Sequence, residues 1–429
     1  MLTPAEQQTL DALIGIRQPG YSLPGSFYRG ALVYRAALET IWQRVWLFAG
    51  HSCEVAQPGD FLTWQVGNDP LLITRDDQGE LHALFNVCRH RGTLLCEAAS
   101  GQRRRFVCPY HQWTYAADGT LVSCRGMHEV DRSALGLRRA HIREVAGLMF
   151  VSLAAQPPPF EAAAACLQPL LAPQGLERAR VARQIDYDVA ANWKLVWENN
   201  RACYHCNVNH PQYVRANFDH YNRDDTTAAI RGQIDTAVRH HQQQVTDAGI
   251  AITHRESGMT VFPDPDAGLW YSANRTPLVE GYVSESLDGR QVAPLMGDYT
   301  SATVGTLRMR TVPNFWNHSS CDHSGSTRLL ATGPQSTQIR VTWLVDHEAV
   351  AGRDYQLDDL LPFWQRTSEQ DWELCERAQR GIASAGYRPG PYSEYKEYNV
   401  DRFVRWYLHR LAASVNRPTT AGEPTDAPA

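Results

Sequence analysis

Two short motifs of cysteine and histidine constrain this chain more than any other feature of its sequence. They are Cys88-Arg89-His90 and Cys108-Pro109-Tyr110-His111, and residues 91–107 separate them. Each motif can occupy the tip of a hairpin loop, so two facing loops would present two thiolates and two imidazoles around a shared point. The spacing therefore predicts a metal centre built from these two cysteines and two histidines.

The composition places both motifs in an ordinary folded protein. The chain has 429 residues, 43% hydrophobic and 20% charged, which is enough for two or three domains with sizeable cores. Its 10 Cys are too few for a disulfide scaffold at this length. Together with 16 His, they direct attention to metal-ligand spacing instead.

Charge and hydropathy exclude several other classes of protein. With 41 basic and 46 acidic side chains the net charge is −5, without the basic excess of a nucleic-acid surface. No apolar run approaches the roughly 20 residues that span a bilayer. Residues 1–17 lack the basic start and apolar segment of a secretory signal. We therefore expect a cytoplasmic chain with no nucleic-acid or membrane partner.

The pattern of strands and breakers predicts how the domains are arranged. Short strands and turns fill residues 45–155, which is typical of a small all-β domain, and Pro157-Pro158-Pro159 follows its last strand. Residues 1–44 read as helical pieces belonging to the second, larger domain, whose main part is residues 156–414. The Pro-rich segment 415–429 is expected to be a disordered tail.

The larger domain mixes helices and strands. We expect helices at 192–207 and 357–380 and strands at 306–312, 327–332 and 338–345. Blocks of strands beside blocks of helices predict an α+β fold. In this fold the all-β domain is inserted in an α/β domain whose central antiparallel sheet is flanked by helices.

The ligand types of the first centre separate two kinds of metal site. Tetrahedral zinc also accepts mixed Cys and His ligands, but its usual pattern opens with two cysteines close together. Here each loop supplies one Cys and one His, as in a Rieske [2Fe-2S] cluster, where one iron takes both thiolates and the other both imidazoles. We interpret Cys88, His90, Cys108 and His111 as the ligands of such a cluster.

A second candidate centre lies near the end of the predicted helix at 192–207. On an ideal helix His205 and His210 would point about 140° apart. Pro211 disfavours helical geometry at the residue before it, so the helix should end near Asn209 and let His210 turn back toward His205. The alternative is a pair of hydrogen-bonded histidines at a helix end. Cys203 and Cys206 resemble a redox pair, although we expect them to line the core or a cavity.

Two imidazoles and one carboxylate form the facial triad that binds Fe(II) and leaves coordination positions open for O₂. The best carboxylate is Asp371, on a C-terminal helix whose apolar positions indicate one buried face. A buried carboxylate usually has a partner such as a metal. The sequence therefore predicts mononuclear iron at His205, His210 and Asp371.

From about residue 25 to 410 the chain resembles the catalytic α-subunit of Rieske non-haem iron oxygenases, and within them the group that demethylates quaternary ammonium compounds. The resemblance rests on these segments: Asn192-Trp193-Lys194, Glu198-Asn199-Asn200-Arg201, Tyr204-His205-Cys206, His210-Pro211, Gln370-Asp371, Gln379-Arg380-Gly381 and Pro389-Gly390-Pro391-Tyr392-Ser393. Known members act on glycine betaine, stachydrine and carnitine, and residues 207–221 look closer to the stachydrine type than to the glycine betaine type.

The resemblance implies a monooxygenase component that removes a methyl group from a betaine with O₂ and releases formaldehyde. It also implies NAD(P)H as electron source through a flavin and ferredoxin-type reductase, and a homotrimer. A fixed cation is recognised by aromatic faces, and Trp316 is a candidate, although it could equally be a core aromatic. The alternatives are a ring-hydroxylating dioxygenase for an aromatic acid and a Rieske electron carrier.

One position departs from the family pattern. Members carry an acidic residue three positions before the first iron-binding His, where it links the two metal centres of adjacent subunits, and here that position is Ala202. Alanine offers no carboxylate, so we expect both metals to bind but to be poorly coupled. The substitution is either engineered or marks a natural branch, and whether Glu198, four residues earlier, compensates stays open.

Overall fold

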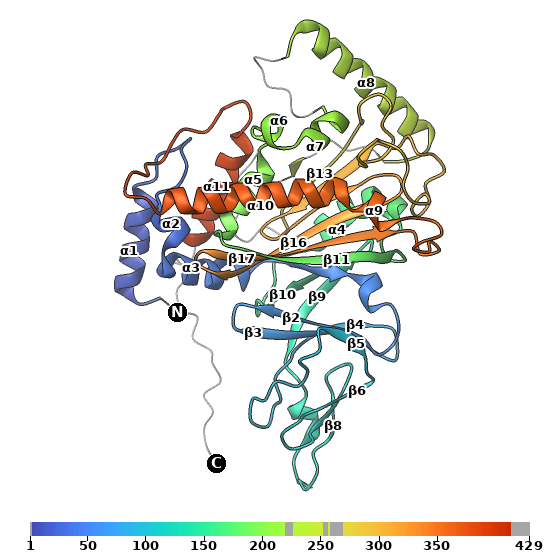
Figure 1. Ribbon diagram of the computed structural model, residues 1–429. Coiled ribbons are helices and arrows are strands. Elements are labelled where there is room, and N and C mark those ends of the chain that lie inside the picture. The colour runs from blue at the N-terminus through green and yellow to red at the C-terminus, as the bar shows by residue number, and fades with distance from the viewer. Residues whose placement is uncertain (1, 128, 219–225, 252–255, 258–268, 413–429) are drawn as a thin grey trace.

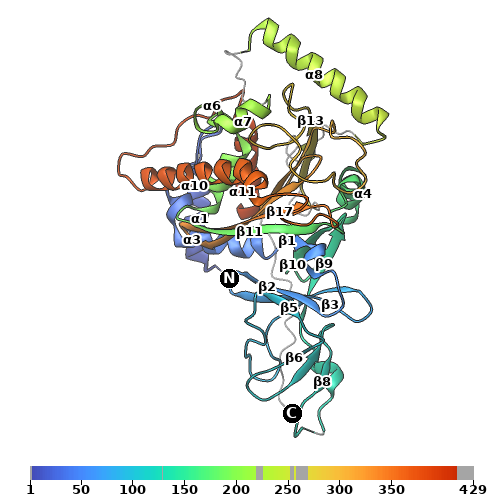
Figure 2. The same ribbon diagram turned by 45° about the vertical axis from the view of Figure 1, so that its right-hand side comes forward.

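The computed structural model describes residues 2–127, 129–218, 226–251, 256–257 and 269–412. Figure 1 shows a strand-rich part at the bottom of the view and a larger part above it in which helices cover a second sheet. The view turned by 45° shows the same two-part arrangement (Figure 2). No helix in the described part of the chain combines the length and the apolar character needed to cross a bilayer.

The strand-rich part contains a seven-stranded and a three-stranded antiparallel sheet. In spatial order the larger sheet is β1 (Leu47–His51), β10 (Leu148–Ser152), β9 (Arg139–Val145), β4 (Leu81–Phe85), β3 (Asp69–Arg75), β2 (Asp60–Val66) and β5 (Ser100–Gln102). The smaller sheet is β6 (Arg105–Val107), β7 (Thr114–Ala116) and β8 (Leu121–Ser123). The short 3-10 turns are η2 (Ser52–Val55) and η3 (Arg132–Leu135).

A turn at Asp118-Gly119 joins β7 to β8. Gly119 has φ +88°, a left-handed conformation that favours glycine, and a Cβ there would lie 2.8 Å from a methyl carbon of Leu84. The hairpin therefore closes tightly onto β4. Behind it the strands enclose a small core that includes Cys88, Cys108 and Trp113, so two of the predicted metal ligands belong to that core.

The larger part is organised around a second seven-stranded sheet in which every paired strand is antiparallel. Its order is β11 (Arg180–Val189), β17 (Ser336–Val345), β16 (Ser324–Gly333), β15 (Phe315–Ser319), β14 (Thr306–Thr311), β13 (Tyr271–Thr276) and β12 (Glu256–Ser257). This arrangement, with helices against the sheet, confirms the predicted α+β fold with a central antiparallel sheet.

Helices from both ends of the chain pack against this sheet (Figure 1). The N-terminal ones are α1 (Pro4–Gly15), α2 (Ser26–Arg29), α3 (Ala31–Ala37) and the π-helical turn η1 (Leu38–Trp42). The others are α4 (Glu161–Leu171), η4 (Ala172–Gln174), α5 (Trp193–Arg201), α6 (Cys206–Asn209), α7 (Pro211–Ala216), α8 (Ala228–Asp247), α9 (Leu357–Leu360), α10 (Pro362–Ile382) and α11 (Tyr398–Ala412).

Two of the predicted helices are interrupted in the structure. The helix expected at 192–207 begins after its N-cap Asn192 but ends at Arg201, because Ala202 is extended at φ −136° and ψ 120°. The helix expected at 357–380 is divided before Pro362, which starts α10 at the position where proline needs no hydrogen-bonded N–H. The predicted domain boundaries stay predictions, and the tail at 415–429 lies outside the described residues.

Candidate metal centres

The first candidate centre is formed by two loops of the strand-rich part, residues 88–93 after β4 and residues 108–113 between β6 and β7. In each loop the cysteine N–H donates to a carbonyl farther along, that of Thr93 at 2.8 Å for Cys88 and that of Trp113 at 2.7 Å for Cys108. Both cysteines are almost completely buried, whereas both histidines are half-buried. The loops therefore hold their thiols inward and their imidazoles at the surface.

The structure brings the two predicted imidazoles together. The rings of His90 and His111 lie 4.6 Å apart, and His90 stacks on Trp113 at 4.9 Å. The Nδ1 atom of His90 is buried and has no hydrogen-bond partner among the described residues. Burial, followed by the neighbouring His90 and Arg91, lowers the pKa of His111. A buried ring nitrogen without a partner among the described residues, beside a second imidazole, fits a metal-binding role.

Tyr115 supports the cysteine side of this centre. Its hydroxyl lies 3.4 Å from Cys88 Sγ and accepts a hydrogen bond from the Arg89 N–H at 3.0 Å. A hydroxyl that accepts from the backbone can direct its own proton toward sulfur, which stabilises a metal-bound thiolate. Tyr115 carries no local sequence signal for this role, because only the fold places it beside Cys88.

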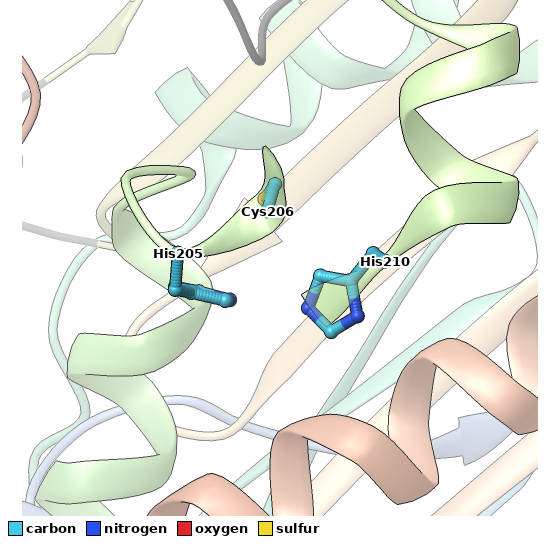
Figure 3. A group of neighbouring side chains, drawn as sticks. All are labelled: His205, Cys206 and His210. Carbon is cyan, nitrogen blue, oxygen red and sulfur yellow. The ribbon is translucent and has the colours of Figure 1, made fainter. Parts of the chain in front are cut away.

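The second candidate centre forms where α5 ends and α6 and α7 begin. The extended backbone at Ala202 turns the chain out of α5, and His205 then precedes α6 while His210 separates α6 from α7. His210 has φ −123° and ψ 68°, outside the helical region, as Pro211 requires of the residue before it. Figure 3 shows the two imidazoles facing a common space, their rings 5.1 Å apart.

Asp371, on α10, completes this group. Its Oδ1 atom lies 3.1 Å from His205 Nε2 and 3.0 Å from His210 Nε2. Burial raises the pKa of Asp371, but hydrogen bonds from the two histidines more than offset this and hold the pKa below its usual value. Two imidazole nitrogens and a carboxylate oxygen thus converge from three segments, which is the donor set predicted for Fe(II).

Gln370 fixes the orientation of His210. Its Oε1 lies 2.8 Å from His210 Nδ1 and accepts a hydrogen bond from Gln212 Nε2 at 3.0 Å. Gln212 also donates to Thr367 Oγ1 at 2.7 Å. With Nδ1–H bound to Gln370, His210 presents Nε2 to the space shared with Asp371, as metal-ligating histidines commonly do.

Cys206 also lies in this group, but its sulfur is bonded elsewhere. The described residues include a cluster of His205, Cys206 and His210 whose possible ligand atoms all lie within 4.8 Å of one another. Cys206 forms a disulfide with Cys203, so its sulfur carries no thiolate charge. Both cysteines also belong to a small hydrophobic core with Tyr213, Ala216 and Phe363, as expected, and the disulfide adds a covalent link between them. Asp371 is the better third donor because it is anionic.

Ala202 borders a cavity beside the second centre. The cavity, of about 290 Å³, is also lined by Glu198, Tyr204, His205 and Glu397. Both carboxylate oxygens of Glu198 accept hydrogen bonds from the Tyr28 hydroxyl, at 3.0 and 3.1 Å. Burial raises the pKa of Glu198 to about 7, against the opposing effects of Tyr28 and Lys194. The Tyr28 hydroxyl thus fixes the carboxylate of Glu198. Ala202 also lines the cavity but offers no carboxylate.

Trp316 lies in the main core. It is 6% exposed and packs between Trp197 and Trp372, with ring centroids at 5.9 and 6.3 Å. Other aromatic rings, for which the sequence indicates no role, lie beside the segment 205–210 that carries the two histidines. Tyr213, three residues after His210, is 6.0 Å from Trp364, which in turn is 4.1 Å from the His318 ring.

An arginine adjoins this aromatic group from the sheet. Arg308 on β14 is paired in register with His318 on β15, so the two side chains share one face of the sheet. Its guanidinium lies over the Tyr213 ring at 5.8 Å and donates to Asn217 Oδ1 at 2.6 Å. Asn217 also donates to the fully buried Glu285 at 3.3 Å. A cation, its counter-charge and three aromatic rings therefore lie together around Tyr213 on α7, the helix that begins directly after His210.

The two candidate centres lie at opposite ends of the molecule. In both views α6 and α7 are near the top, whereas β6 and β8, next to the cysteine-histidine loops, are at the bottom (Figures 1 and 2). The two large sheets lie between them. Within one chain, therefore, the centres are not neighbours.

Comparison with known families matches both parts of the chain. Residues 45–134 match the Rieske [2Fe-2S] domain, and residues 176–413 match the ring hydroxylating alpha subunit (catalytic domain). The glycine betaine monooxygenase oxygenase subunit of Chromohalobacter salexigens is 39% identical over 97% of this chain and 91% of its own length. The protein of the same name from Pseudomonas aeruginosa is 37% identical, covering 96% of this chain and 93% of its own.

A solved structure has the same fold. The crystal structure of the quaternary ammonium Rieske monooxygenase CntA with a bound inhibitor aligns with a TM-score of 0.67 and 20% identity, over 95% of this chain and 98% of its own. At this identity the likeness concerns the fold.

Proposed function

This chain belongs to the α-subunit family of Rieske oxygenases, and from that premise we propose that it removes a methyl group from a carboxylated quaternary ammonium compound, a betaine. The family carries a Rieske [2Fe-2S] cluster and mononuclear iron, uses O₂, and receives electrons from a separate reductase. The predicted cofactors and enzyme class are thereby confirmed. The betaine, the individual ligand residues and the products are part of the proposal.

The observation that carries the proposal is the meeting of His205, His210 and Asp371 around one point. These three residues would hold the mononuclear iron, and Gln370 would fix the ring of His210. The bound iron supplies O₂ activation and hydroxylation of a methyl C–H bond. A hydroxylated N-methyl group leaves as formaldehyde, and the tertiary amine remains.

Cys88, His90, Cys108 and His111 would hold the cluster. Neutral imidazoles in place of two thiolates reduce its negative charge and raise its reduction potential. Because the two centres lie at opposite ends of one chain, we propose that the chain forms a homotrimer in which the cluster-binding loops of one subunit would lie against the iron-binding residues of the next. Ala202 would lie where the two subunits meet, without the carboxylate that family members carry at this position. Electron transfer between the two centres would therefore be slow.

The group around Tyr213 suits both ends of a betaine. A quaternary ammonium ion offers no N–H group, and the faces of Trp364 and Tyr213 would stabilise it by cation–π attraction. The carboxylate of the substrate would pair with Arg308, whose guanidinium matches carboxylate geometry. Trp364 precedes Asp371 by seven residues on α10, two turns along the same face, which separates the two backbone positions by about 10 Å along the helix axis.

Two observations bear on which betaine the chain recognises. Two similar relatives are named for glycine betaine, whereas the sequence at 207–221 predicted stachydrine, and residues 219–221 lie outside the described part of the chain. Both compounds have a fixed cation one carbon away from a carboxylate. We therefore propose this short spacing as the recognised feature.

The test is aerobic incubation of the chain with a matched reductase, NADH and a panel of glycine betaine, stachydrine, carnitine, choline and benzoate. We expect formaldehyde from glycine betaine and stachydrine. A cis-diol from the aromatic acid would instead identify a ring-hydroxylating dioxygenase. An iron content of about two rather than about three atoms per chain would identify an electron carrier. Because Ala202 is expected to slow turnover, an inactive panel is repeated with Ala202→Glu.

A further inference from the structure

We propose that the Cys203–Cys206 disulfide decides which metal ion the second centre holds, because opening it adds the sulfur of Cys206 to the donor set. This inference rests on the proposed role of His205, His210 and Asp371 as metal ligands. It concerns a thiol–disulfide step that the oxygenase reaction does not require.

The disulfide encloses the first candidate ligand. Cys203 and Cys206 are bonded across Tyr204 and His205, with their Cα atoms 5.1 Å apart. Cys206 is also 6% exposed, and its sulfur lies within 4.8 Å of ring nitrogens of both His205 and His210. Figure 3 shows the three side chains around one space, with Cys206 on the segment between the two histidines.

The two redox states give the centre different donor sets. With the disulfide closed, the available donors are two imidazoles and the carboxylate of Asp371, which leaves coordination positions open and suits Fe(II). With the disulfide open, the Cys206 thiolate becomes a fourth donor. Two His, one Asp and one Cys can close a tetrahedron, which is the geometry of a structural zinc site with no open position.

The opening step balances as a thiol–disulfide exchange with a dithiol. A thiolate of the dithiol attacks the sulfur of Cys203, forming a mixed disulfide there and releasing Cys206 as a thiolate. The second thiol of the dithiol then displaces Cys203, so the protein gains two thiols and the dithiol becomes a cyclic disulfide. An oxidised partner of the same class reverses the reaction. Attack at Cys203 is favoured because Cys203 is half-buried whereas Cys206 is buried.

The surrounding turn leaves a path to Cys203. Tyr204 is 55% exposed and Val208 is 85% exposed, so the segment that carries the disulfide borders solvent. The remaining cysteines are free, and Cys166 on α4 is exposed. Cys166 therefore offers a control for thiol chemistry that has no connection with the metal centre.

The test compares two variants that both remove the disulfide but differ in the sulfur they leave. Cys203→Ser leaves Cys206 as a permanent thiol, whereas Cys206→Ser leaves only Cys203. Zn²⁺ affinity is measured by competition with a fluorescent chelator on the full-length, cluster-loaded protein. It is measured for both variants, Cys166→Ser and the parent chain, each with and without dithiothreitol. Cluster absorbance reports folding, and Cys203→Ala replaces Cys203→Ser if the latter does not fold.

We expect dithiothreitol to tighten Zn²⁺ binding at least about tenfold in the parent chain and in Cys166→Ser. Cys203→Ser should bind tightly, and Cys206→Ser weakly, in both conditions. Equal affinities for Cys203→Ser and Cys206→Ser would overturn the inference, because the disulfide would then act only as a brace for the loop. Finding Cys203 and Cys206 both alkylated in the protein before reduction would overturn it as well.

Failure of the proposed function would look different. If His205→Ala and Asp371→Asn leave Zn²⁺ and Fe(II) binding unchanged, the site itself is not a metal centre, and both proposals fall. If those variants lose metal but the two cysteine variants behave alike, only the disulfide inference falls.

Discussion

His210 and Asp371 lie 161 residues apart in the chain, yet the Nε2 atom of one is 3.0 Å from the Oδ1 atom of the other. The same oxygen is 3.1 Å from Nε2 of His205. Hydrogen bonds from two imidazoles to one carboxylate oxygen gather all three donors around a single point. A metal ion bound there would replace these hydrogen bonds with coordination, so the account predicts a site that binds iron through all three residues.

Replacing Asp371 should remove the mononuclear iron and spare the cluster. Asp371→Asn keeps the shape of the side chain but loses its charge, so iron should fall from about three to about two atoms per chain. Metal analysis by mass spectrometry, together with the visible spectrum of the cluster, measures this. Glu369→Gln, two residues earlier on α10, is the matched control, since Glu369 accepts from Tyr187 and Gln365 on the exposed side. Retention of all three iron atoms in Asp371→Asn would contradict the assignment.

Restoring a carboxylate at position 202 should accelerate repeated turnover. Ala202→Glu would place a carboxylate in the cavity beside His205, and we expect at least about a tenfold rise in steady-state demethylation, or about 1.4 kcal/mol in the barrier. A single turnover starting from reduced protein should change much less. Ala202→Gln, of the same size but uncharged, is the control. An unchanged steady-state rate in Ala202→Glu would remove the argument that Ala202 limits coupling.

Removing the guanidinium of Arg308 should weaken binding of the substrate carboxylate. A charge-assisted hydrogen bond contributes about 1.5–3 kcal/mol, so Arg308→Gln should raise the Kd for glycine betaine roughly 10- to 150-fold. Tetramethylammonium has the same cation without the carboxylate, and its Kd should change little. Arg310→Gln is the control on the same strand, because Arg310 donates to Asn200 at 2.8 Å. Equal loss of both ligands in Arg308→Gln would indicate damage to the aromatic group around Tyr213 rather than a lost ion pair.

Stability should depend on pH through the fully buried His51. Burial lowers the pKa of His51 from 6.5 to about 4, with Glu54 opposing the change and Arg328 adding to it. Between these values the unfolded chain binds a proton that the folded chain does not, so stability is present above pH 6.5 and falls as the pH falls toward 4. At pH 5 the loss should be about 2 kcal/mol.

Urea unfolding of the parent chain and of His51→Gln at pH 7.5 and pH 5 measures this loss. The variant should lose about 2 kcal/mol less than the parent between the two pH values. The exposed His347→Gln serves as the matched control and should follow the parent. A His51→Gln variant with the same pH dependence as the parent would assign the acid sensitivity to other groups.

The candidate metal ligands could be proposed from the sequence because residues close together in the chain indicate them. One Cys and one His in each of two loops allow few alternatives, and Pro211 alone indicates that His210 cannot continue a helix. The antiparallel sheet of the larger part followed from strand patterns and turn residues in the same way. The comparisons confirm the family, the fold class and both cofactors.

Features that depend on distant contacts were not predictable. Arg308 and Trp364 carry no local signal, and only the pairing of β14 with β15 and the packing of α10 bring them beside Tyr213. The early end of α5 at Arg201 was also missed, since the helical pattern of the sequence continues through this point. Cys203 and Cys206 had spacing that permits a disulfide, but spacing alone does not distinguish a bonded pair from two packed thiols.

The most direct test of the central claim traces the methyl carbon that leaves the substrate. Glycine betaine labelled with ¹³C in its N-methyl groups is incubated with the chain, preferably as Ala202→Glu, with a reductase, NADH and O₂, and the products are quantified by NMR. The account predicts one equivalent of labelled formaldehyde for each dimethylglycine formed and each O₂ consumed. NADH and O₂ consumption without labelled formaldehyde from this or any other betaine would contradict it.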